Sequence, residues 1–535
     1  MDRQPSKNFF TTLPTVIIGA GFTGLFTALH LRNQNYLCDL ILIDPQKQFV
    51  FKPMLYELLT EELPEKLVCP DYAELLQGSD IHFVEDQVVK LDLQQKQLEL
   101  ATGHSYSYRY LVLAIGSSQG YLGTEGAREN AFAFRSRQEA LTLRQHLQTC
   151  LQRAREIEER EDGDGESKKS LLTFVIVGAG PSGVEMAATL ADLLPYWYAR
   201  LGGNIHDIKI ILINHADRIL AGDANAHLQQ EALQALQKRT IPVELRLGVS
   251  VKSVSSDRLT YQHQDREEVL SLPTQTTIWT AGTANNPLLE SISAQIPSEH
   301  INRHGQPIVS QTLQLLDFPE VFAAGDCVQV QDQNQPALAQ VAYQQGAAIA
   351  HNLMALSQNH PLQISNAQLR GTLMKLGLGN GVANLFDKVQ IHGKVGDLIR
   401  NATYLEMLPT PLHNFKATAI WLEEETFNRY HHPLPLTPEQ LQTLKLTPAE
   451  QKERLWVKVL AVVTPLILAI AAYVSLQTPP NERFPIPQQN QQIQPPLSKA
   501  LYHVAPERSK PALSRHLASD HRPFCDCNGT FCLCL

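Results

Sequence analysis

Two glycine-rich loops carry the clearest chemistry in this sequence. Each has the spacing G-x-G-x-x-G, and the glycines are Gly19, Gly21 and Gly24 in the first loop and Gly178, Gly180 and Gly183 in the second. Each loop follows a short β-branched run and opens an apolar stretch typical of a helix. Glycines at this spacing allow a tight turn and let a pyrophosphate approach the backbone at a helix N-terminus. The sequence therefore predicts two dinucleotide-binding sites.

The residue that ends the next strand differs between the two repeats. Asp44 follows Gly24 by twenty residues, and a carboxylate there can accept hydrogen bonds from a ribose 2′-hydroxyl. At the end of the corresponding strand, 208–214, stands Asn214. A neutral amide does not repel the 2′-phosphate of NADPH as a carboxylate would. We therefore expect NADPH to be tolerated at the second site, and we lean toward a preference for it. Arg218 is either a contact of that phosphate or a surface charge.

The composition is that of a globular protein large enough to hold two such domains. The chain has 535 residues, 43% hydrophobic and 19% charged, which is enough for several globular domains. The net charge of −9 and the absence of a basic stripe argue against nucleic acid as a partner. The residues 337–356 predict a helix with small residues on one side, and Ser136 begins a capping-box pattern.

Three further segments resemble those of two-dinucleotide flavoprotein reductases. Residues 110–117, with Ala114 and Gly116, resemble the strand that returns to the first domain. Residues 323–326 resemble the segment in which Gly325 precedes an aspartate, here Asp326, that meets the ribityl–phosphate part of FAD. Residues 279–282, ending at Gly282, resemble the crossover between domains. The resemblance implies an α/β fold with two Rossmann-like domains, in which an FAD domain is split by an inserted NAD(P)H domain.

Within that group, the chain resembles the type II NAD(P)H:quinone oxidoreductases over residues 12–430. The stretches 49–59 and 370–429 resemble the cyanobacterial and plastid branch in particular. The resemblance implies an enzyme that passes a hydride from NADH or NADPH to FAD and then two electrons to a membrane quinone. It implies no proton pumping, and the sequence agrees, since no ionisable residue follows Lys458 within the apolar segment near the end.

The same resemblance suggests the site residues. Gln340 and Gln344 are four apart and share a helix face, which the family places beside the flavin and the quinone. Glu185 corresponds to a family glutamate near the nicotinamide that contacts substrate or delivers a proton. Pro53 and Tyr56 match a segment near the flavin. The alternatives are two solvent-facing glutamines and an acid that merely favours the helix macrodipole.

The division into domains follows from these motifs and from the composition. We expect an FAD domain in two parts, a connecting helix with a charged linker, an NAD(P)H domain, a membrane-proximal region, a membrane-anchoring helix and a disordered tail. In chain order, the boundaries are 1–135 for the first FAD part, 136–170 for the linker, 171–283 for the NAD(P)H domain, 284–385 for the second FAD part with the quinone-site helix, 386–454 for the membrane-proximal region, 455–477 for the anchor and 478–535 for the tail.

The anchor rests on an apolar run without charges at 459–476, long enough to span a bilayer. Pro465 leaves a kinked or surface-lying helix as an alternative. Lys452, Arg454 and Lys458 stand on its N-terminal side, which favours a catalytic body on the cytoplasmic or stromal-equivalent face. The expected partners are membrane lipid and the quinone pool, and a homodimer is left open.

The cysteines bear on the rival functions. No metal site is expected, although four cysteines crowd the tail at Cys525, Cys527, Cys532 and Cys534. Cys327 is expected to be a small buried side chain rather than a redox thiol. The alternatives are a flavoprotein similar to sulfide:quinone oxidoreductase, which needs redox cysteines beside the flavin, and a non-catalytic FAD redox sensor at the membrane. A disulfide reductase would need a C-x₄-C pair after the first loop, and none is present.

Overall fold

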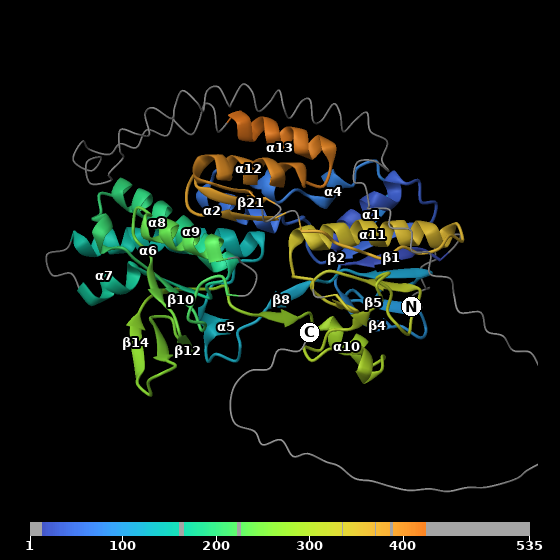
Figure 1. Ribbon diagram of the computed structural model, residues 1–535, viewed down its shortest axis with the longest axis horizontal. Coiled ribbons are helices and arrows are strands. Elements are labelled where there is room, and N and C mark those ends of the chain that lie inside the picture. Colours follow the sequence, from blue (N-terminus) through green and yellow to red (C-terminus); the bar gives the residue numbers. More distant parts are fainter. Residues whose placement is uncertain are drawn as a thin grey trace, which may run out of the picture. The chain divides into compact units, whose positions relative to one another are not determined.

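The computed structural model of the protein describes residues 13–159, 165–221, 226–333, 335–369, 371–385 and 389–423 (Figure 1). The predicted membrane segment 455–477, the tail 478–535 and the tail cysteines therefore lie outside the described residues. Within the described part of the chain, no helix combines the length and the apolar character that crossing a bilayer requires.

The first glycine loop belongs to a five-stranded parallel sheet. Its strands, in spatial order, are β18 (Val321–Ala323), β7 (Tyr110–Leu113), β1 (Thr15–Ile18), β2 (Leu40–Asp44) and β3 (Ile81–Glu85). Four of these strands precede the second glycine loop and β18 follows it. Because Val321 of β18 pairs with Leu111 of β7, the chain returns to the first sheet after building the second. The split first domain that the motifs predict is therefore present in this sheet.

The second glycine loop belongs to a four-stranded parallel sheet. Its strands, in spatial order, are β11 (Glu244–Arg246), β10 (Lys209–Ile213), β9 (Thr173–Val177) and β15 (Thr276–Trp279). Every residue of β9 and β15 is buried, as strands covered on both faces require. The helices α6 (Arg137–Glu158), α8 (Pro181–Arg200) and α9 (Ala226–Gln237) lie on one side of β10 (Figure 1). On the other side lie β12 (Val249–Val254) and β14 (Val269–Pro273), which both pair antiparallel with β13 (Arg258–His263).

Smaller sheets complete the described part. A crossover joins the two large sheets, since β8 pairs antiparallel with β16. The remaining strands are β4 (Val88–Asp92), β5 (Gln97–Leu100), β6 (Ser105–Ser107), β8 (Ser117–Gln119), β16 (Thr283–Asn285), β17 (Ile308–Val309) and β19 (Gln329–Val330). The shorter helices are α2 (Leu55–Thr60), α3 (Glu65–Val68), α4 (Tyr72–Leu75), α5 (Ala127–Asn130), α7 (Gly165–Leu171) and α10 (Leu288–Ser293).

Two predicted helices can be compared with the structure directly. Helix α6 begins after Ser136, whose hydroxyl accepts from the Glu139 amide while the Glu139 carboxylate accepts from the Ser136 amide. This confirms the capping box. The helix predicted over 337–356 is α11 (Ala339–Ser357), which starts two residues later because Leu338 is extended.

Helix α11 packs closely on α1 (Phe22–Asn33) of the first sheet. The contact needs a glycine, since a Cβ at Gly346 would lie 2.6 Å from the carbonyl oxygen of Thr23. The Thr27 hydroxyl also donates to the Gly346 carbonyl, at 3.1 Å. The helix predicted to face the quinone is thus held on the helix that begins at the first glycine loop.

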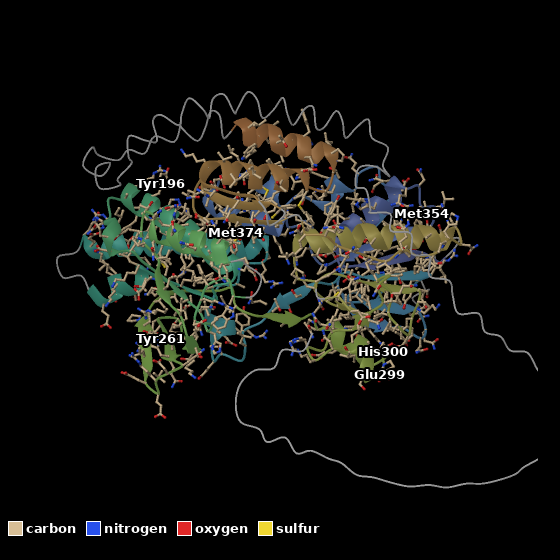
Figure 2. The ribbon with its side chains drawn as sticks, in the orientation of Figure 1. Tyr196, Tyr261, Glu299, His300, Met354 and Met374 are labelled. Atoms are coloured by element: carbon tan, nitrogen blue, oxygen red, sulfur yellow. The ribbon has the colours of Figure 1, made fainter. Side chains whose placement is uncertain are left out.

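The chain ends its described part in a small sheet and two helices. The sheet contains β20 (Gly371–Lys375), β21 (Gly381–Leu385) and β22 (Val389–His392), and the helices are α12 (Gly393–Glu406) and α13 (Pro411–Glu423). Met374 and Val382 belong to the hydrophobic core of the second sheet. Figure 2 shows Met374 beside the helices of that part. The β20–β21 hairpin is therefore packed against the second dinucleotide domain although it lies far from it in sequence.

Candidate functional site

The first glycine loop has the shape that a pyrophosphate needs. A Cβ at Gly24 would overlap the carbonyl oxygen of Gly19, and one at Gly19, where φ is +92°, would overlap that of Ala114. A Cβ at Gly21 would meet no protein atom within 4 Å, so this face of the loop is open to a ligand. The Asp44 carboxylate accepts from the Ala20 amide at 2.7 Å. The residues therefore fit a dinucleotide at the N-terminus of α1.

The second loop repeats this arrangement with an amide in place of the acid. A Cβ at Gly183 would overlap the carbonyl oxygen of Gly178, and one at Gly180 would meet nothing within 4 Å. The Asn214 side-chain oxygen accepts from the Ala179 amide at 3.0 Å. Its nitrogen donates to the Arg218 carbonyl at 2.9 Å, which closes the turn after β10. Asn214 therefore keeps the structural contact of Asp44 without its charge.

The substitution Gly24→Ala should strip FAD from the protein and also lower its stability. The new methyl group would overlap the carbonyl oxygen of Gly19, so the loop must shift. Gly21→Ala is the matched control, because its methyl would enter only the open space. We expect Gly21→Ala to melt near the wild-type temperature when both are free of FAD, while its affinity for FAD falls. Fluorescence titration with FAD and thermal unfolding measure the two effects. Equal melting temperatures for both apo variants would contradict this account of Gly24.

Asp326 is fixed at the carboxyl edge of the first sheet. The Ser117 hydroxyl donates to Asp326 at 3.0 Å, and the Arg135 guanidinium donates to the same hydroxyl at 2.8 Å. The preceding glycine, Gly325, has a φ of +80°, and its amide donates to the buried Gln345 side chain at 2.7 Å. The motif predicted the position of Asp326. Sequence reasoning missed Gln345, because it directed attention to the neighbouring Gln344.

The remaining motif glycines lie at the crossover between the two large sheets. Gly116 and Gly282 both have positive φ values, +60° and +73°, which a residue with a side chain rarely adopts. A Cβ at Gly282 would lie 3.0 Å from the Leu122 side chain. Gly116 precedes β8 and Gly282 precedes β16. The two residues therefore shape the connections between the sheets.

Gln340 and Gln344 lie on one face of α11, as predicted, and both amide groups reach a neighbouring segment. The Gln340 amide donates to the Gly371 carbonyl at 3.0 Å. Gln344 donates to the Gln368 carbonyl at 2.9 Å and accepts from the Gln368 amide at 2.9 Å. In this structure the two glutamines therefore tie α11 to the residues around the start of β20.

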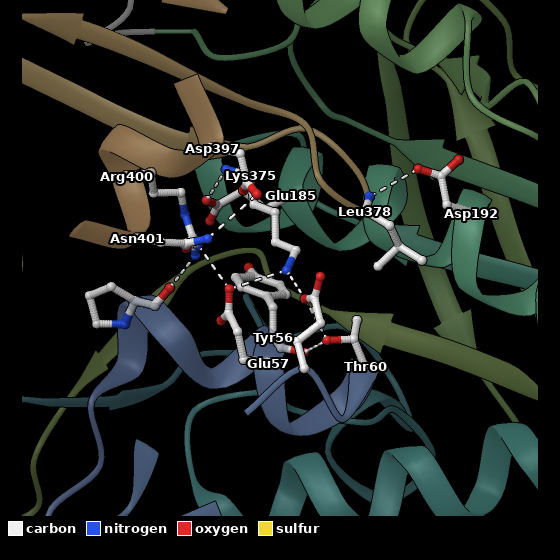
Figure 3. Close-up of polar contacts among 12 residues, drawn as sticks. Tyr56, Glu57, Thr60, Glu185, Asp192, Lys375, Leu378, Asp397, Arg400 and Asn401 are labelled. Atoms are coloured by element: carbon white, nitrogen blue, oxygen red, sulfur yellow. Dashed lines mark hydrogen bonds and ion pairs between the residues drawn. The ribbon is translucent and has the colours of Figure 1, made fainter. Parts of the chain in front are cut away.

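A group of charged side chains lies between α2, β20 and α12. We call this group the buried ion cluster, and its members are Glu57, Glu62, Lys375, Asp397 and Arg400 (Figure 3). Lys375 Nζ lies 3.1 Å from the Glu57 carboxylate, and Arg400 Nη1 lies 2.9 Å from the same oxygen. These three side chains are at most 3% exposed. Burial opposes the ionised form of Glu57, but Arg400 and Lys375 outweigh it and hold the pKa of Glu57 below its usual value.

The buried ion cluster reaches two of the predicted site residues. Arg400 Nη2 donates to the Pro53 carbonyl at 2.6 Å, which fixes the start of α2. Tyr56 follows Pro53 by three residues, packs against Phe134 with ring centroids 5.1 Å apart, and donates to the Ser182 carbonyl at 2.9 Å. Ser182 lies in the first turn of α8. Tyr56 therefore connects the segment matched to the flavin with the helix of the second glycine loop.

Glu185 lies in the first turns of α8, beside Tyr56 and the buried ion cluster. Its carboxylate accepts from the Lys375 amide at 2.8 Å. Glu185 is only partly exposed. Burial raises its pKa to about 7, although Arg400 and the Lys375 amide pull the pKa down. Glu185 can therefore take up or release a proton near neutral pH.

The described cysteines show no redox pair. Cys38, Cys69, Cys150 and Cys327 are all free thiols. Burial raises the pKa of Cys327 to about 12, and its thiol donates to the Ala324 carbonyl. Cys327 is thus a small buried side chain, as predicted. No cluster of His, Cys, Asp or Glu that could hold a metal ion occurs among the described residues.

We call each glycine loop, together with the strand and the helix that flank it, a cradle. Comparisons with known proteins agree with two such cradles. A family profile described as pyridine nucleotide-disulphide oxidoreductase matches residues 13–346. The chain is 29% identical to the alternative NAD(P)H-ubiquinone oxidoreductase C1, chloroplastic/mitochondrial, of Arabidopsis thaliana, over 76% of this chain and 79% of that protein. It is also 29% identical to the demethylphylloquinone reductase NdbB of a Synechocystis strain, over 76% of this chain and 95% of that protein.

A solved structure shows the same fold. The structure of NDH2 from Plasmodium falciparum in complex with NADH superposes with a TM-score of 0.69 and 17% identity, over 78% of this chain and 99% of that one. This match shows the fold, and the two relatives named above confirm the resemblance that the motifs indicated.

Proposed function

The chain belongs to the pyridine nucleotide-disulphide oxidoreductase family, and on that premise we propose that it oxidises NADH or NADPH and reduces a quinone. One arrangement carries the proposal: the fold holds two glycine loops that are open to a dinucleotide. The helix that begins at the second loop carries Glu185, whose carboxylate accepts from the Lys375 amide and whose pKa is raised by burial. Such a group can serve a reaction that consumes a proton, and the net reaction of NAD(P)H, H⁺ and quinone to NAD(P)⁺ and quinol consumes one. The two relatives described above are named as reductases of quinones.

FAD held at the first cradle would supply the redox chemistry, since it can accept a hydride from the nicotinamide and deliver two electrons to a quinone. Gly19, Gly21 and Gly24 would bind its pyrophosphate, Asp44 the ribose, and Asp326 the ribityl–phosphate part. Pro53 and Tyr56 would border its ring system.

The other predicted site residues would act on the substrates. Glu185 would hold a proton at its carboxylate and give it to the quinone oxygen. Gln340 and Gln344 would turn their amides from the backbone of 368 and 371 toward the quinone carbonyls. Substrate-dependent turnover of purified, FAD-loaded protein with NAD(P)H and a short-chain quinone tests the function; protein that keeps FAD but shows no turnover would favour the redox-sensor alternative.

The second cradle would accept NADPH at least as well as NADH. Asn214 presents an uncharged oxygen to the loop, so a 2′-phosphate nearby meets no carboxylate. Asn214→Asp keeps the acceptor for the Ala179 amide, adds a charge and removes the donor to the Arg218 carbonyl. We expect kcat/KM for NADPH to fall by about tenfold or more, which corresponds to roughly 1.4 kcal/mol, while kcat/KM for NADH changes little. A wild-type enzyme that strongly prefers NADH, or equal losses with both nucleotides, would contradict this reading.

The sulfide-oxidising alternative has less support. Its chemistry needs cysteines that become thiolates near the flavin, whereas burial raises the pKa of Cys69, Cys150 and Cys327. Quinone reduction that depends on sulfide in the absence of NAD(P)H would establish that alternative instead.

Membrane association fits a quinone substrate. We propose that the segment 455–477 anchors the enzyme and that the catalytic body faces the cytoplasm or its stromal equivalent. Leu412 and Phe415 of α13 are 64% and 73% exposed, and they would add an apolar contact with lipid. Alkaline carbonate extraction tests the anchor, since release of the protein into the supernatant would exclude a spanning helix. A homodimer and the domain boundaries given above remain part of the proposal.

A further inference from the structure

The β20–β21 hairpin is hydrogen-bonded to two carboxylates on α8. The Lys375 amide donates to Glu185 at 2.8 Å, and the Leu378 amide donates to Asp192 at 3.0 Å. The two acids are seven residues apart, which is close to two turns, so they share one face of the helix. Figure 3 shows both contacts. The hairpin thus lies along α8 with one backbone amide at each acid.

Asp192 is held firmly at its end of this arrangement. One oxygen accepts from Arg239 Nη1 at 3.0 Å, and the other accepts from the Thr240 amide at 3.1 Å and the Thr240 hydroxyl at 3.0 Å. Asp192 and Arg239 are each 12% exposed. A hydrogen-bonded ion pair of this kind is oriented more strictly than an exposed one.

The turn of the hairpin rests directly on this ion pair. Gly377 has a φ of +120°, and a Cβ there would overlap both Arg239 Nη1 and an Asp192 oxygen. The chain therefore has a glycine where the backbone must approach the two charged groups. From this turn, β20 runs back through Lys375, whose ammonium enters the buried ion cluster.

We propose that Asp192 is a positioning residue, which fixes the hairpin turn so that the Lys375 amide stays hydrogen-bonded to Glu185. The inference rests on the proposed role of Glu185 as the proton donor. Asp192 itself contacts neither substrate nor cofactor in this proposal, and it acts only through the strand β20.

The groups around Glu185 determine what a displaced hairpin would do. Tyr56 and Glu57 face it from α2, Lys375 from β20, and Arg400 and Tyr404 from α12. The Lys375 amide, the Lys375 ammonium and Arg400 favour the ionised carboxylate, while burial and Glu57 oppose it. Movement of β20 away from α8 removes two of the three favourable contributions. Water that enters with this movement weakens the effect of burial, which is the largest cause of the raised pKa of Glu185. The lost contacts and the entering water act on this pKa in opposite directions, so the pKa moves from its value of about 7 with the sign of the larger effect.

The test is the pH profile of quinone reduction by the FAD-loaded enzyme with the variant Asp192→Asn. An asparagine keeps only one of the two acceptor oxygens that serve Arg239, Thr240 and the Leu378 amide, and it loses the charge that pairs with Arg239, so the turn is held less firmly. We expect the descending limb of kcat to move from its wild-type position by about half a unit or more, with KM for NAD(P)H unchanged. Asp207→Asn is the matched control, because it breaks the Lys168–Asp207 ion pair of 2.9 Å in the same domain without contact to the hairpin. Its profile should coincide with that of the wild type.

A second variant keeps the proposal testable if Asp192→Asn fails to fold. Arg239→Gln removes the cation under Gly377 and leaves the Asp192 carboxylate in place, and it should shift the limb in the same direction by a smaller amount. A profile identical to that of the wild type in either folded variant would overturn the inference. If the wild type itself lacks quinone-dependent turnover, the proposed function fails instead, and the two failures are therefore distinct.

Discussion

Glu185→Gln is expected to slow quinone reduction by about 10²- to 10⁴-fold, the range for loss of a general acid, while flavin reduction by NAD(P)H stays close to the wild-type rate. A glutamine keeps an oxygen for the Lys375 amide, which donates to Glu185 at 2.8 Å, but it has no proton to give. Anaerobic stopped-flow measurements separate the two half-reactions. Glu290→Gln, an exposed first-turn acid on α10, is the control and should leave both rates unchanged.

The pH dependence provides a second readout for Glu185. Its pKa of about 7 lies above the ordinary value of 4.5, so the protonated form contributes stability. This contribution is complete below pH 4.5 and is lost as the pH rises through about 7. The free energy of unfolding falls by at most about 3 kcal/mol over this range. Solvent that still reaches the side chain makes the change smaller. Thermal unfolding of Glu185→Gln should therefore show a weaker decline between pH 5 and pH 8. A mutant with full quinone turnover would remove Glu185 from the mechanism.

Arg400→Met is expected to reduce the free energy of unfolding by about 3–5 kcal/mol. The substitution leaves Glu57, which is 3% exposed, with Lys375 as its remaining close cation, and it removes the 2.6 Å bond to the Pro53 carbonyl. Denaturant unfolding of the FAD-loaded protein, followed by circular dichroism, measures the change.

Two comparisons make the Arg400 prediction specific. Lys168→Met breaks two ion pairs, with Glu158 and Asp207, whose side chains are 21%, 25% and 36% exposed, and it should cost no more than about 1 kcal/mol for each pair. Adding Glu57→Gln to Arg400→Met should recover part of the lost stability, since the formal charge of the buried ion cluster then returns to its wild-type value. A loss of stability in Arg400→Met as small as that in Lys168→Met would show that burial does not make the loss of an ion-pair partner more costly in this cluster.

The parts of the site that could be predicted from the sequence are local. Each glycine loop is contiguous in the chain with its strand and its helix. The residues around Gly24 and Gly183 are therefore enough to predict a dinucleotide-binding loop. Asp44 and Asn214 were predictable because each stands at the end of the strand that follows the helix of its loop. The structure adds that each side chain accepts a hydrogen bond from a backbone amide of its own loop, Asp44 from Ala20 and Asn214 from Ala179.

The parts that could not be predicted depend on contacts between distant residues. Arg400 meets Glu57 across 343 positions, and Lys375 meets Glu185 across 190. Neither cation belongs to a motif with fixed spacing. Asp192 looks like an ordinary helix acid until the hairpin turn at Gly377 is placed against it. The side-chain amide of Gln344 was predicted to face a quinone. Nothing in the helix pattern indicates that it reaches Gln368 instead.

The most direct test of the central claim is an anaerobic titration of the FAD-loaded enzyme, followed by absorbance. We expect NADH or NADPH to bleach the oxidised flavin band in proportion to the nucleotide added, and a quinone then to restore the band without oxygen. A flavin that NAD(P)H does not bleach, or a bleached flavin that no quinone restores, would contradict the proposed electron path from nicotinamide to quinone.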